Sequence, residues 1–494
     1  MMDEAGLSIF LTSLTSSLAF ALGCVTQAPA VRWMCFYGFP GILLDFVFQI
    51  TFFIACIVLD ERRIQNSRMD CLVCVPRKGA AEIPEGRRGP CLDGTEKFMV
   101  SFARCLFHPL SKVFVVMLFT GMFVACVISA TSLEHIFDFT ELLPDDSYVL
   151  MFYDAYDGFT EDGAVFAGVF FRDVDQTDSA IQDQMIDYYE RLTEQEDIEA
   201  IGCWVIAYRD YLVDNPEASN LTIPEVVKMN PSLDKSQLDD AVTFVFDESG
   251  RIVLSSCAIR VFLPYGSTDR QIGVVEHIHD VTRTQPINNG SMDGPFFVYD
   301  QIFQLWEYSL VAIDELTIMT ITSVTAVGSI SLLLMPHWSS ALFMFPMLAV
   351  MYLDVLGFMQ WFDVPINAST TTILTISVGL LVDYMMHILF SYLALKGTRV
   401  ERARLALETI GTSVFLGGSS TLIGVLFLGF GQTQVFQTLF TLFVIIILVG
   451  MAHGLIFLPV VLSIVGPELV GHKQLEDGKP VSGTSLDSEK SSQE

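Results

Sequence analysis

Charged side chains are scarce in this sequence. Asp, Glu, Lys and Arg make up 17% of the 494 residues, whereas hydrophobic residues make up 52% and the mean hydropathy is +0.50. Soluble domains carry about 25% charged residues, so this composition excludes an ordinary soluble protein. It predicts a membrane protein.

Positive charge is scarcer still, with 27 Lys and Arg against 57 Asp and Glu and a net charge of −30. Residues 131–305 hold 33 acidic and 9 basic side chains, which accounts for −24 of that total. The acidity therefore belongs mainly to one segment. An acidic surface repels phosphate backbones, so nucleic acid is not an expected partner.

Metal-binding and catalytic motifs are missing as well. Cys71 and Cys74 form a CxxC, but the second close pair that a zinc site normally has is absent, and Cys91 and Cys105 stand apart. We therefore expect no metal and favour reduced or acylated cysteines near the membrane. Neither a nucleophile–base pair nor a phosphate-binding glycine loop stands out, so we predict no cofactor and no enzymatic activity.

The sequence does contain long apolar runs. A membrane core of about 30 Å needs ~20 helical residues. Eight segments are long enough: 5–24, 35–59, 113–130, 314–334, 341–360, 372–395, 412–430 and 436–465. Ala28-Pro29-Ala30 after the first run imitates a signal-peptide cleavage site, but the acidic start MMDEAG favours a transmembrane helix.

Lysines and arginines indicate the orientation, because they concentrate in cytosolic loops. They cluster in residues 60–112 and again from Lys396 to Arg404. Both segments are therefore predicted to be cytosolic. Eight crossings would then leave both termini in the cytosol and residues 131–305 outside the cell or in a lumen.

The external segment has the pattern of a mixed α/β domain. Residues 178–196 place apolar side chains on one helical face, with Asp178 or Ser179 available as the cap. GAVFAGVFF predicts a buried strand before this helix. AVTFVF and RIVLSSCAIRVFL, separated by DESG, predict a hairpin after it.

Cysteines and glycosylation sequons also mark the external segment. Cys203 and Cys257 could form a disulfide in an oxidising compartment, although two buried thiols are nearly as plausible from the sequence. Asn220 and Asn289 begin Asn-x-Ser/Thr sequons and are possible N-glycosylation sites. A third match at Asn367 lies in a short loop against the membrane and is the weakest.

One predicted transmembrane helix, SVGLLVDYMMHILFSYLALKG from Ser377 to Gly397, carries Asp383 and His387 near its middle. An aspartate there costs ~2.5–3.5 kcal/mol to insert, whereas an interhelical hydrogen bond returns only ~0.6 kcal/mol on average. Function therefore explains the charge better than packing does. A histidine one helical turn from a carboxylate suits proton exchange or ion coordination.

Three other polar residues lie within apolar runs: Asp354, Asp45 and His453. Each stands alone in its predicted helix. We expect these residues to lie near a helix end or to bond locally, which is a structural role.

The chain also resembles itself. A shift of 405 residues lays SIFL at residues 8–11 over SVFL at residues 413–416, and Phe52 over Phe457. Such a repeat of a two-helix unit suggests two homologous halves, as in parallel-repeat transporters. The first half would then show only its final two helices.

Several stretches, in order, resemble the second half of Patched and Niemann-Pick C type proteins, eukaryotic members of the resistance-nodulation-division (RND) superfamily. The densest agreement is KGTRVERARLALETIGTSVF, followed by QVFQ and HGLIFLPVVLSIVGP. PAVRWMCFYGFPGILLDFVFQITFFIACIVLDERR resembles the last helix of the family's sterol-sensing domain. LLPDDSY resembles the start of its second external domain.

The resemblance implies a protein that moves or senses sterols or other lipids. In such proteins a glycine-x-x-x-acid pattern is tied to proton or cation coupling, and here it is Gly379-Leu-Leu-Val-Asp383. Asp45 matches an acid often found at that point of the sterol-sensing helix. The family usually has an acid where this sequence has Ser16, and the expected partner acid of Asp383 lies on an upstream helix that this chain lacks.

The expected fold is a polytopic α-helical membrane protein of RND type, with about eight transmembrane helices and one α+β extracellular or lumenal domain. We divide it into residues 1–59 (last two helices of a sterol-sensing-like first half), 60–112 (cytosolic linker), 113–130 (transmembrane helix), 131–305 (acidic external domain), 306–466 (five-helix bundle) and 467–494 (disordered cytosolic tail).

The expected function is gradient-driven movement of sterols or other lipids, with a proton or monovalent cation as the coupling ion. The alternatives are a sterol-sensing or ligand-binding receptor without transport, or a truncated inactive fragment. A genuine half-protein would need a partner half. The expected location is the plasma membrane or an endosomal or lysosomal membrane.

Overall fold

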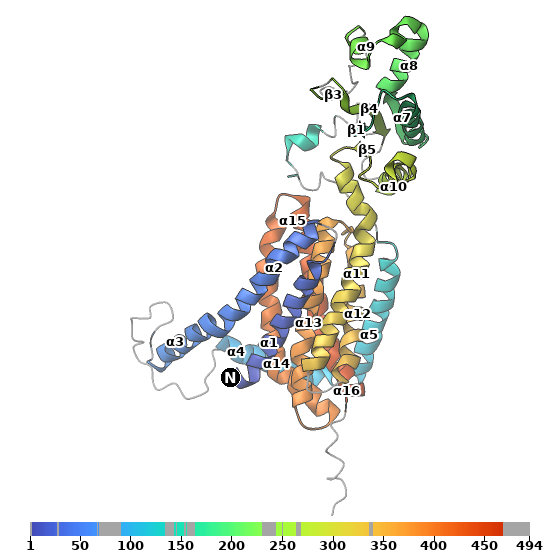
Figure 1. Cartoon of the computed structure of the whole chain (residues 1–494). Coiled ribbons are helices and arrows are strands. Elements are labelled where there is room, and N and C mark those ends of the chain that lie inside the picture. Colours follow the sequence, from blue (N-terminus) through green and yellow to red (C-terminus); the bar gives the residue numbers. More distant parts are fainter. Residues whose placement is uncertain are drawn as a thin grey trace, which may run out of the picture.

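The computed structural model combines a bundle of long helices with a small sheet domain that stands beyond one end of it (Figure 1). The structure describes residues 2–26, 29–66, 68, 90–133, 143–144, 146–152, 155, 164–229, 244–248, 250–262, 268–334 and 339–467. The CxxC at Cys71 and the tail from residue 468 lie outside these ranges.

The bundle consists of long apolar helices. Their bounds are α1 (Met2–Gly23), α2 (Pro29–Phe48), α3 (Ile54–Gln65), α5 (Pro109–Ala130), α11 (Phe303–Leu334), α12 (Ser339–Trp361), α13 (Ala368–Ala394), α14 (Arg399–Val425), α15 (Gln434–Ala452) and α16 (Leu458–Val465). One π-helical turn, η1 (Gln49–Phe53), joins α2 to α3, and another, η7 (His453–Phe457), joins α15 to α16. Each of these pairs therefore forms one continuous span.

Within the described residues, seven spans are long and apolar enough to cross a membrane. They correspond to the last seven of the eight predicted runs. The first predicted run falls on α1, which has 22 residues but is only partly described at the level of side chains. The eighth crossing stays a prediction.

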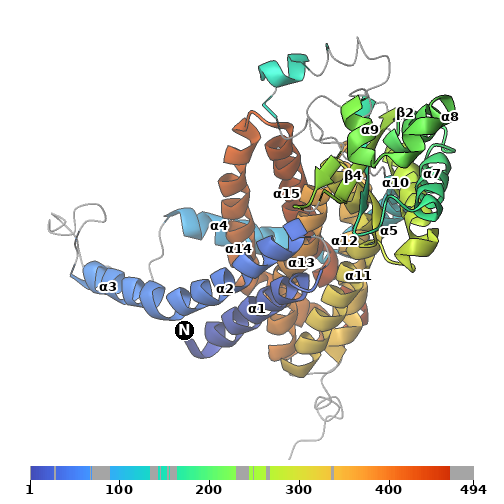
Figure 2. The same cartoon turned by 45° about the horizontal axis from the view of Figure 1, so that its top comes forward.

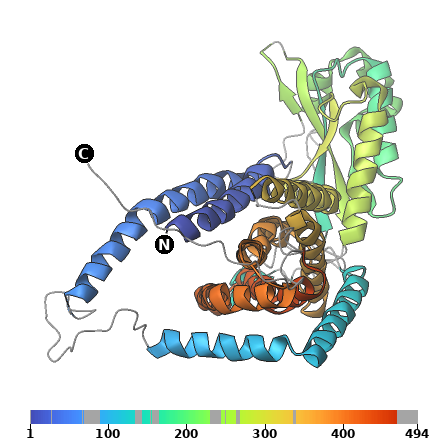
Figure 3. The ribbon, with the colours of Figure 1, turned by 90° about the horizontal axis from the view of Figure 1, so that it is seen from below.

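Helices α3 and α4 (Pro90–Leu106) flank the basic linker and lie toward the end of the bundle away from the sheet domain (Figure 1). Seen from below, α4 runs along the edge of the bundle into α5 (Figure 3). Met99 of α4 lies against Gly411 of α14. This placement agrees with the orientation that the basic residues predict.

Arg402 of α14 is only 1% exposed, although it belongs to the basic cluster from Lys396 to Arg404. Its guanidinium donates to the carbonyl of Tyr392 at the end of α13 and to the carbonyl of Pro467 after α16. It also lies over the Tyr392 ring at 4.1 Å. Carbonyls at helix C-termini carry partial negative charge, so the arginine binds two helix ends together.

Helix α13 is the centre of the bundle and packs against α1, α11, α14 and α15. Its side chains are buried or half-buried along nearly the whole length, and its apolar residues from Leu381 to Tyr392 join the largest core cluster. A membrane helix surrounded by protein can carry polar groups that lipid would not accept. The fold thus shields the helix that carries Asp383.

The sheet domain is antiparallel, with strand order β2-β4-β1-β5 and β3 paired to β4. Its strands are β1 (Ala164–Arg172), β2 (Ile198–Gly202), β3 (Phe244–Phe246), β4 (Ile252–Phe262) and β5 (Phe296–Tyr299). Its helices are α7 (Ser179–Leu192), α8 (Trp204–Asp214), α9 (Ile223–Met229) and α10 (Thr268–Thr284). The domain stands over the side of the bundle that contains α11, α12 and α5 (Figure 2).

The predicted helix and strands of this domain are confirmed. The side chain of Asp178 caps α7 by accepting from Ala180 N, and β1 pairs with β4 in the region of the predicted strands. Apolar residues of α7 and α10 share one core cluster with alternate residues of β1 and β4. Sequence reasoning missed β2 and β5, because each is too short to show a period.

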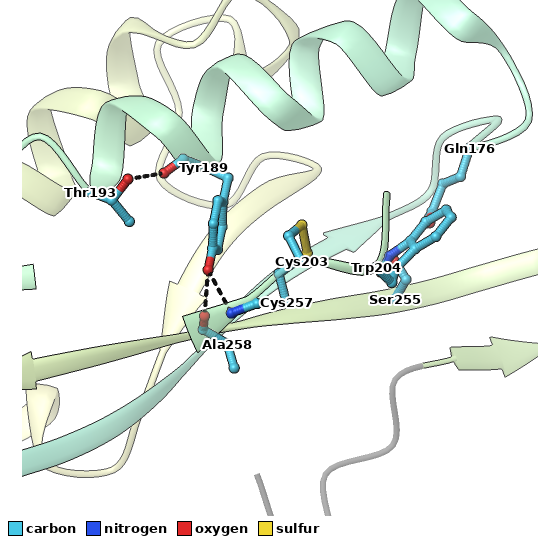
Figure 4. The surroundings of a disulfide bond; sticks show 9 residues. Gln176, Tyr189, Thr193, Cys203, Trp204, Ser255, Cys257 and Ala258 are labelled. Atoms are coloured by element: carbon cyan, nitrogen blue, oxygen red, sulfur yellow. Dashed lines mark hydrogen bonds between the residues drawn. A yellow bond between two sulfur atoms is a disulfide. The ribbon is translucent and has the colours of Figure 1, made fainter. Parts of the chain in front are cut away.

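Cys203 and Cys257 form a disulfide that ties the start of α8 to β4 (Figure 4). Nearby, the Tyr189 hydroxyl donates to Ala258 O at 2.7 Å and accepts from Gly202 N at 3.1 Å. Burial raises the pKa of Tyr189 to about 12. The phenol therefore stays protonated and joins α7 to β2 and β4.

The two sequon asparagines of this domain, Asn220 and Asn289, are exposed, and Asn289 has a positive φ of 50°. Asn367 is 6% exposed, and its side chain accepts from Thr370 N as the N-cap of α13. The first two side chains are accessible, whereas the third already has a structural role.

Helices α5 and α12 approach each other at Gly357. A Cβ at this position would lie 2.4 Å from the Cα and 2.5 Å from the carbonyl oxygen of Cys126 on α5. A backbone cannot move aside as a side-chain end can, so we expect Gly357→Ala to push the helices apart and lower the free energy of unfolding by about 1–3 kcal/mol. Denaturant titration in detergent micelles measures this loss.

Gly121→Ala is the matched control on α5, because no atom lies within 4 Å of a Cβ built there. This variant should unfold at or slightly above the wild-type denaturant concentration, since alanine favours helix over glycine. Equal losses in the two variants would contradict the close helix contact.

Candidate functional site

The first candidate site lies at the middle of α13, where Gly379 faces α1. A Cβ at Gly379 would lie 3.3 Å from both the Cα and the Oγ of Ser16. That spacing is tighter than most contacts of real Cβ atoms, so a larger residue here would require Ser16 to move, and glycine favours the close approach of the two helices. The glycine of the Gly-x-x-x-Asp pattern therefore has a packing role.

Asp383 lies one turn further along α13 and accepts a hydrogen bond from the Ser16 hydroxyl. Its other oxygen, Oδ1, is buried and has no hydrogen-bond partner. Buried polar atoms normally have a partner. A carboxylate with one hydroxyl donor and one unsatisfied oxygen can take up a proton or help bind a cation.

His387, the predicted partner of Asp383, is half-buried one turn beyond it on α13. The hydrogen bond that Asp383 receives comes from α1 instead. The structure brings a hydroxyl from α1 to the Asp383 side chain, and the partner acid that the resemblance implies stays a prediction. The sharing of a proton between Asp383 and His387 stays a prediction.

Asp354 and His453 form a second buried site, so Asp354 meets a residue of another span and does not bond only locally. The structural role expected for both residues stays a prediction. Nε2 of His453 lies 3.1 Å from Oδ2 of Asp354, and both side chains are 0% exposed. Asp354 is on α12 and His453 begins the π-helical turn η7, 99 positions later in the chain. Only the packing of α12 against the α15–η7–α16 span brings them together, which no pattern within either helix shows.

The wall of this second site comes from α5. The ring of Phe119 meets the His453 ring edge-on at 4.9 Å between centroids. The Cys126 thiol lies against the Asp354 carboxylate. The site thus joins α5, α12 and η7.

Asp45, the third expected polar residue, lies on the exposed surface of α2 and accepts a hydrogen bond of 2.7 Å from Gln49. This is the local bonding that the sequence predicted. Sequence reasoning missed Glu315 of α11, which is 8% exposed and accepts a bond of 2.6 Å from Thr26. It lies at the edge of a predicted span, where a charge is ordinary.

A cavity of about 900 Å³ lies where the sheet domain meets the bundle. Helix α10 lines it with Glu276, His279 and Asp280, while α11 contributes Leu310 and Val311. This lining joins polar groups to an apolar wall, which is the mixture that an amphipathic molecule requires.

Comparisons with known proteins agree with this architecture. The model of the family described as "Sterol-sensing domain of SREBP cleavage-activation" matches residues 1–77. NPC intracellular cholesterol transporter 1 of Sus scrofa is 24% identical over 98% of this chain and 42% of its own length. Patched-related protein 9 of Caenorhabditis elegans is 26% identical over 94% of this chain and 54% of its own length. The chain thus spans about half the length of these relatives.

Among solved structures, the cryo-EM structure of the hedgehog release protein Disp from the water bear Hypsibius dujardini aligns with a TM-score of 0.64 at 15% sequence identity. The alignment covers 94% of this chain and 59% of that one. Together with the seven apolar spans and the separate sheet domain, this likeness defines the class: a polytopic, RND-like membrane protein with one additional α+β domain.

Within that class, the sequence matches show which proteins this chain resembles. The chain is similar to Niemann-Pick C and Patched type proteins along nearly its whole length, and its first 77 residues match a sterol-sensing domain. The resemblance seen in the sequence is confirmed.

Ser16→Ala tests the contact between α1 and α13. The variant removes the hydroxyl that donates to Asp383 and leaves a buried carboxylate without that hydrogen bond, so we expect a loss of about 1–3 kcal/mol in the free energy of unfolding. Ser17→Ala is the neighbouring control, because the Ser17 hydroxyl is buried without a hydrogen-bond partner and its removal should cost little. Equal losses in both variants would rule out a specific Ser16–Asp383 contact.

Proposed function

We propose that this chain belongs to a membrane protein that moves sterols or other lipids, with Asp383 coupling the movement to a proton or cation gradient. The observation that carries the proposal is the Asp383 carboxylate in the central helix, with one hydroxyl donor and one unsatisfied oxygen. Placing such a group in a membrane costs free energy, so its presence there indicates a function.

The proposed coupling follows from the two charge states of Asp383. A charged carboxylate needs water or a cation near it, whereas a neutral one is tolerated in a dry helix contact. Uptake and release of one ion would therefore favour different packings of α1 against α13. Since Gly379 sets the distance between these helices, a small shift there changes the access to the carboxylate.

The comparisons support lipid as the cargo. The matched relative in Sus scrofa is named as a cholesterol transporter, and the family model that matches the first 77 residues is a sterol-sensing domain. The junction cavity, with its polar and apolar walls, is the site that we assign to the cargo on its way between the sheet domain and the membrane. The relatives' names also support a protein that is not an enzyme.

A receptor that senses sterol without moving it is the second candidate. The sterol-sensing match at the N-terminal end of the chain favours it. In that case the junction cavity would bind ligand and Asp383 would serve only packing. We keep the domain division and the multi-pass orientation proposed from the sequence for either function, and we propose the plasma membrane or an endosomal or lysosomal membrane as its location.

Asp383→Asn distinguishes the two candidates. The asparagine amide has the shape of the aspartate carboxylate and can still accept a hydrogen bond from Ser16. It is neutral, so it neither takes up a proton nor balances the charge of a cation. We expect gradient-driven movement of a fluorescent sterol in proteoliposomes to fall to the level of protein-free vesicles, while equilibrium binding of that sterol stays within about twofold of wild type.

Asp363→Asn is the control for this measurement. Asp363 is exposed after α12 and has a φ of 52°, which asparagine also accepts. It should transport like wild type. Full gradient-driven transport by Asp383→Asn would remove Asp383 from the coupling mechanism and leave the receptor as the better explanation.

Val311→Trp tests the cavity. The larger side chain should occupy part of the space beside α10 and reduce sterol binding at least tenfold, because an apolar pocket filled by the protein excludes its ligand. Ile313→Trp, on the same helix but 55% exposed, should bind sterol normally. Unchanged binding in the Val311 variant would place the cargo site elsewhere.

A further inference from the structure

Asp354 and His453 are a buried acid and a buried base in contact. The proposed transport does not explain how many protons lie between their side chains. Both are fully buried, and Oδ2 and Nε2 are 3.1 Å apart. Both carboxylate oxygens of Asp354 and Nε2 of His453 are buried and lack a hydrogen bond of standard geometry. The answer follows from the other nitrogen of the ring.

Nδ1 of His453 lies 2.9 Å from the carbonyl oxygen of Val449, one turn earlier in the same span. A carbonyl oxygen can only accept, so Nδ1 must carry a hydrogen and donate it. The tautomer is thereby fixed by the backbone of α15. In the neutral ring, Nε2 then presents a lone pair to Asp354.

The number of protons between Oδ2 and Nε2 has three possible values. With none, a charged carboxylate faces a lone pair at 3.1 Å inside the bundle, which is repulsive and leaves a buried charge unpaired. With two, a protonated carboxyl faces an imidazolium and a positive charge is left buried. With one, either a carboxyl donates to Nε2 or an imidazolium donates to the carboxylate, and the pair is neutral overall.

We propose that Asp354 and His453 form a second intramembrane proton-binding site, which holds one proton between Oδ2 and Nε2 and is separate from Asp383. The packing of α12 against η7 depends on this proton. Its removal leaves two repelling groups in contact, so the contact between the spans depends on the proton whether or not the protein transports lipid.

The groups around the site leave this proton count unchanged. Cys126 faces Asp354 from α5 as a free, buried thiol, which is a neutral partner. On the side of α13, Tyr384 lies beside η7, because a Cβ built at Gly454 would be 2.7 Å from the Tyr384 carbonyl oxygen. The side chain of Tyr384 is an uncharged phenol. Helices α15 and α16 contain no titratable residue, and α11 contains none after Glu315. His453 is the basic group that faces Asp354.

Counting the proton directly is the test, on the full chain in lipid nanodiscs at neutral pH. Infrared difference spectra against Asp354→Asn show whether Asp354 is a protonated carboxyl. Nitrogen NMR of isotope-labelled histidine, with His453 assigned through His453→Gln, shows whether the ring carries one hydrogen or two. We expect one of two patterns: a protonated Asp354 with a neutral His453 ring, or an ionised Asp354 with an imidazolium.

An ionised Asp354 beside a neutral ring, or a protonated Asp354 beside an imidazolium, would overturn the proposal. So would a His453 ring that carries its hydrogen on Nε2 alone. The histidine measurement on the wild-type chain stands by itself, so the test remains decisive if Asp354→Asn does not fold. Asp383→Asn is the control, because it should change neither signal.

Thermal unfolding gives an independent readout. Raising the pH until the shared proton leaves should lower the unfolding temperature of the wild-type chain by several degrees. In Asp354→Asn, the side-chain amide donates to Nε2 at any pH, so the part of the pH dependence that belongs to this site should disappear. The same alkaline shift in Asp354→Asn and wild type would contradict a proton held between these two residues.

Discussion

A carboxylate buried inside a membrane-spanning bundle needs a polar group from another part of the chain, and the contacts around both buried sites follow from that constraint. Lipid offers no polar partner, so Asp383 and Asp354 each lie at a contact between spans that supplies a polar group: Asp383 meets Ser16 from α1, and Asp354 meets His453 from η7. Helix α13 can carry its acid because other helices of the bundle surround it. The central position of α13 in the bundle is therefore what allows Asp383 to lie within a membrane-spanning helix.

Glycine makes these contacts possible. Gly379 lies one turn before Asp383 and lets Ser16 approach, and Gly357 lies one turn after Asp354 and lets the backbone of Cys126 approach. Gly454, next to His453, lies against the carbonyl of Tyr384 in the same way. Small residues let membrane helices pack at backbone distance. In both sites, the glycine that brings the helices together lies within one turn of the buried acid.

The internal repeat gains a structural counterpart in the two π-helical turns. The shift of 405 residues that aligns the two ends of the sequence carries η1 (Gln49–Phe53) to within one residue of η7 (His453–Phe457). Such turns are rare and recur at functional positions. The two spans nevertheless differ in packing. The first is buried only near its start, at Val31 and Cys35, while the second is packed into the bundle and begins its π turn with the buried His453.

The sequence by itself determined the apolar spans, the separate α+β domain and the cap of α7, because each depends on composition or on a period within one segment. It also singled out Asp383 as a polar residue within an apolar run. It placed Asp354 and His453 in separate helices and assigned them no shared role. Only the tertiary structure decided which polar groups meet, since a pair 99 positions apart depends on how α12 packs against the last span. Helix periodicity shows which face is buried, but it does not show what that face touches.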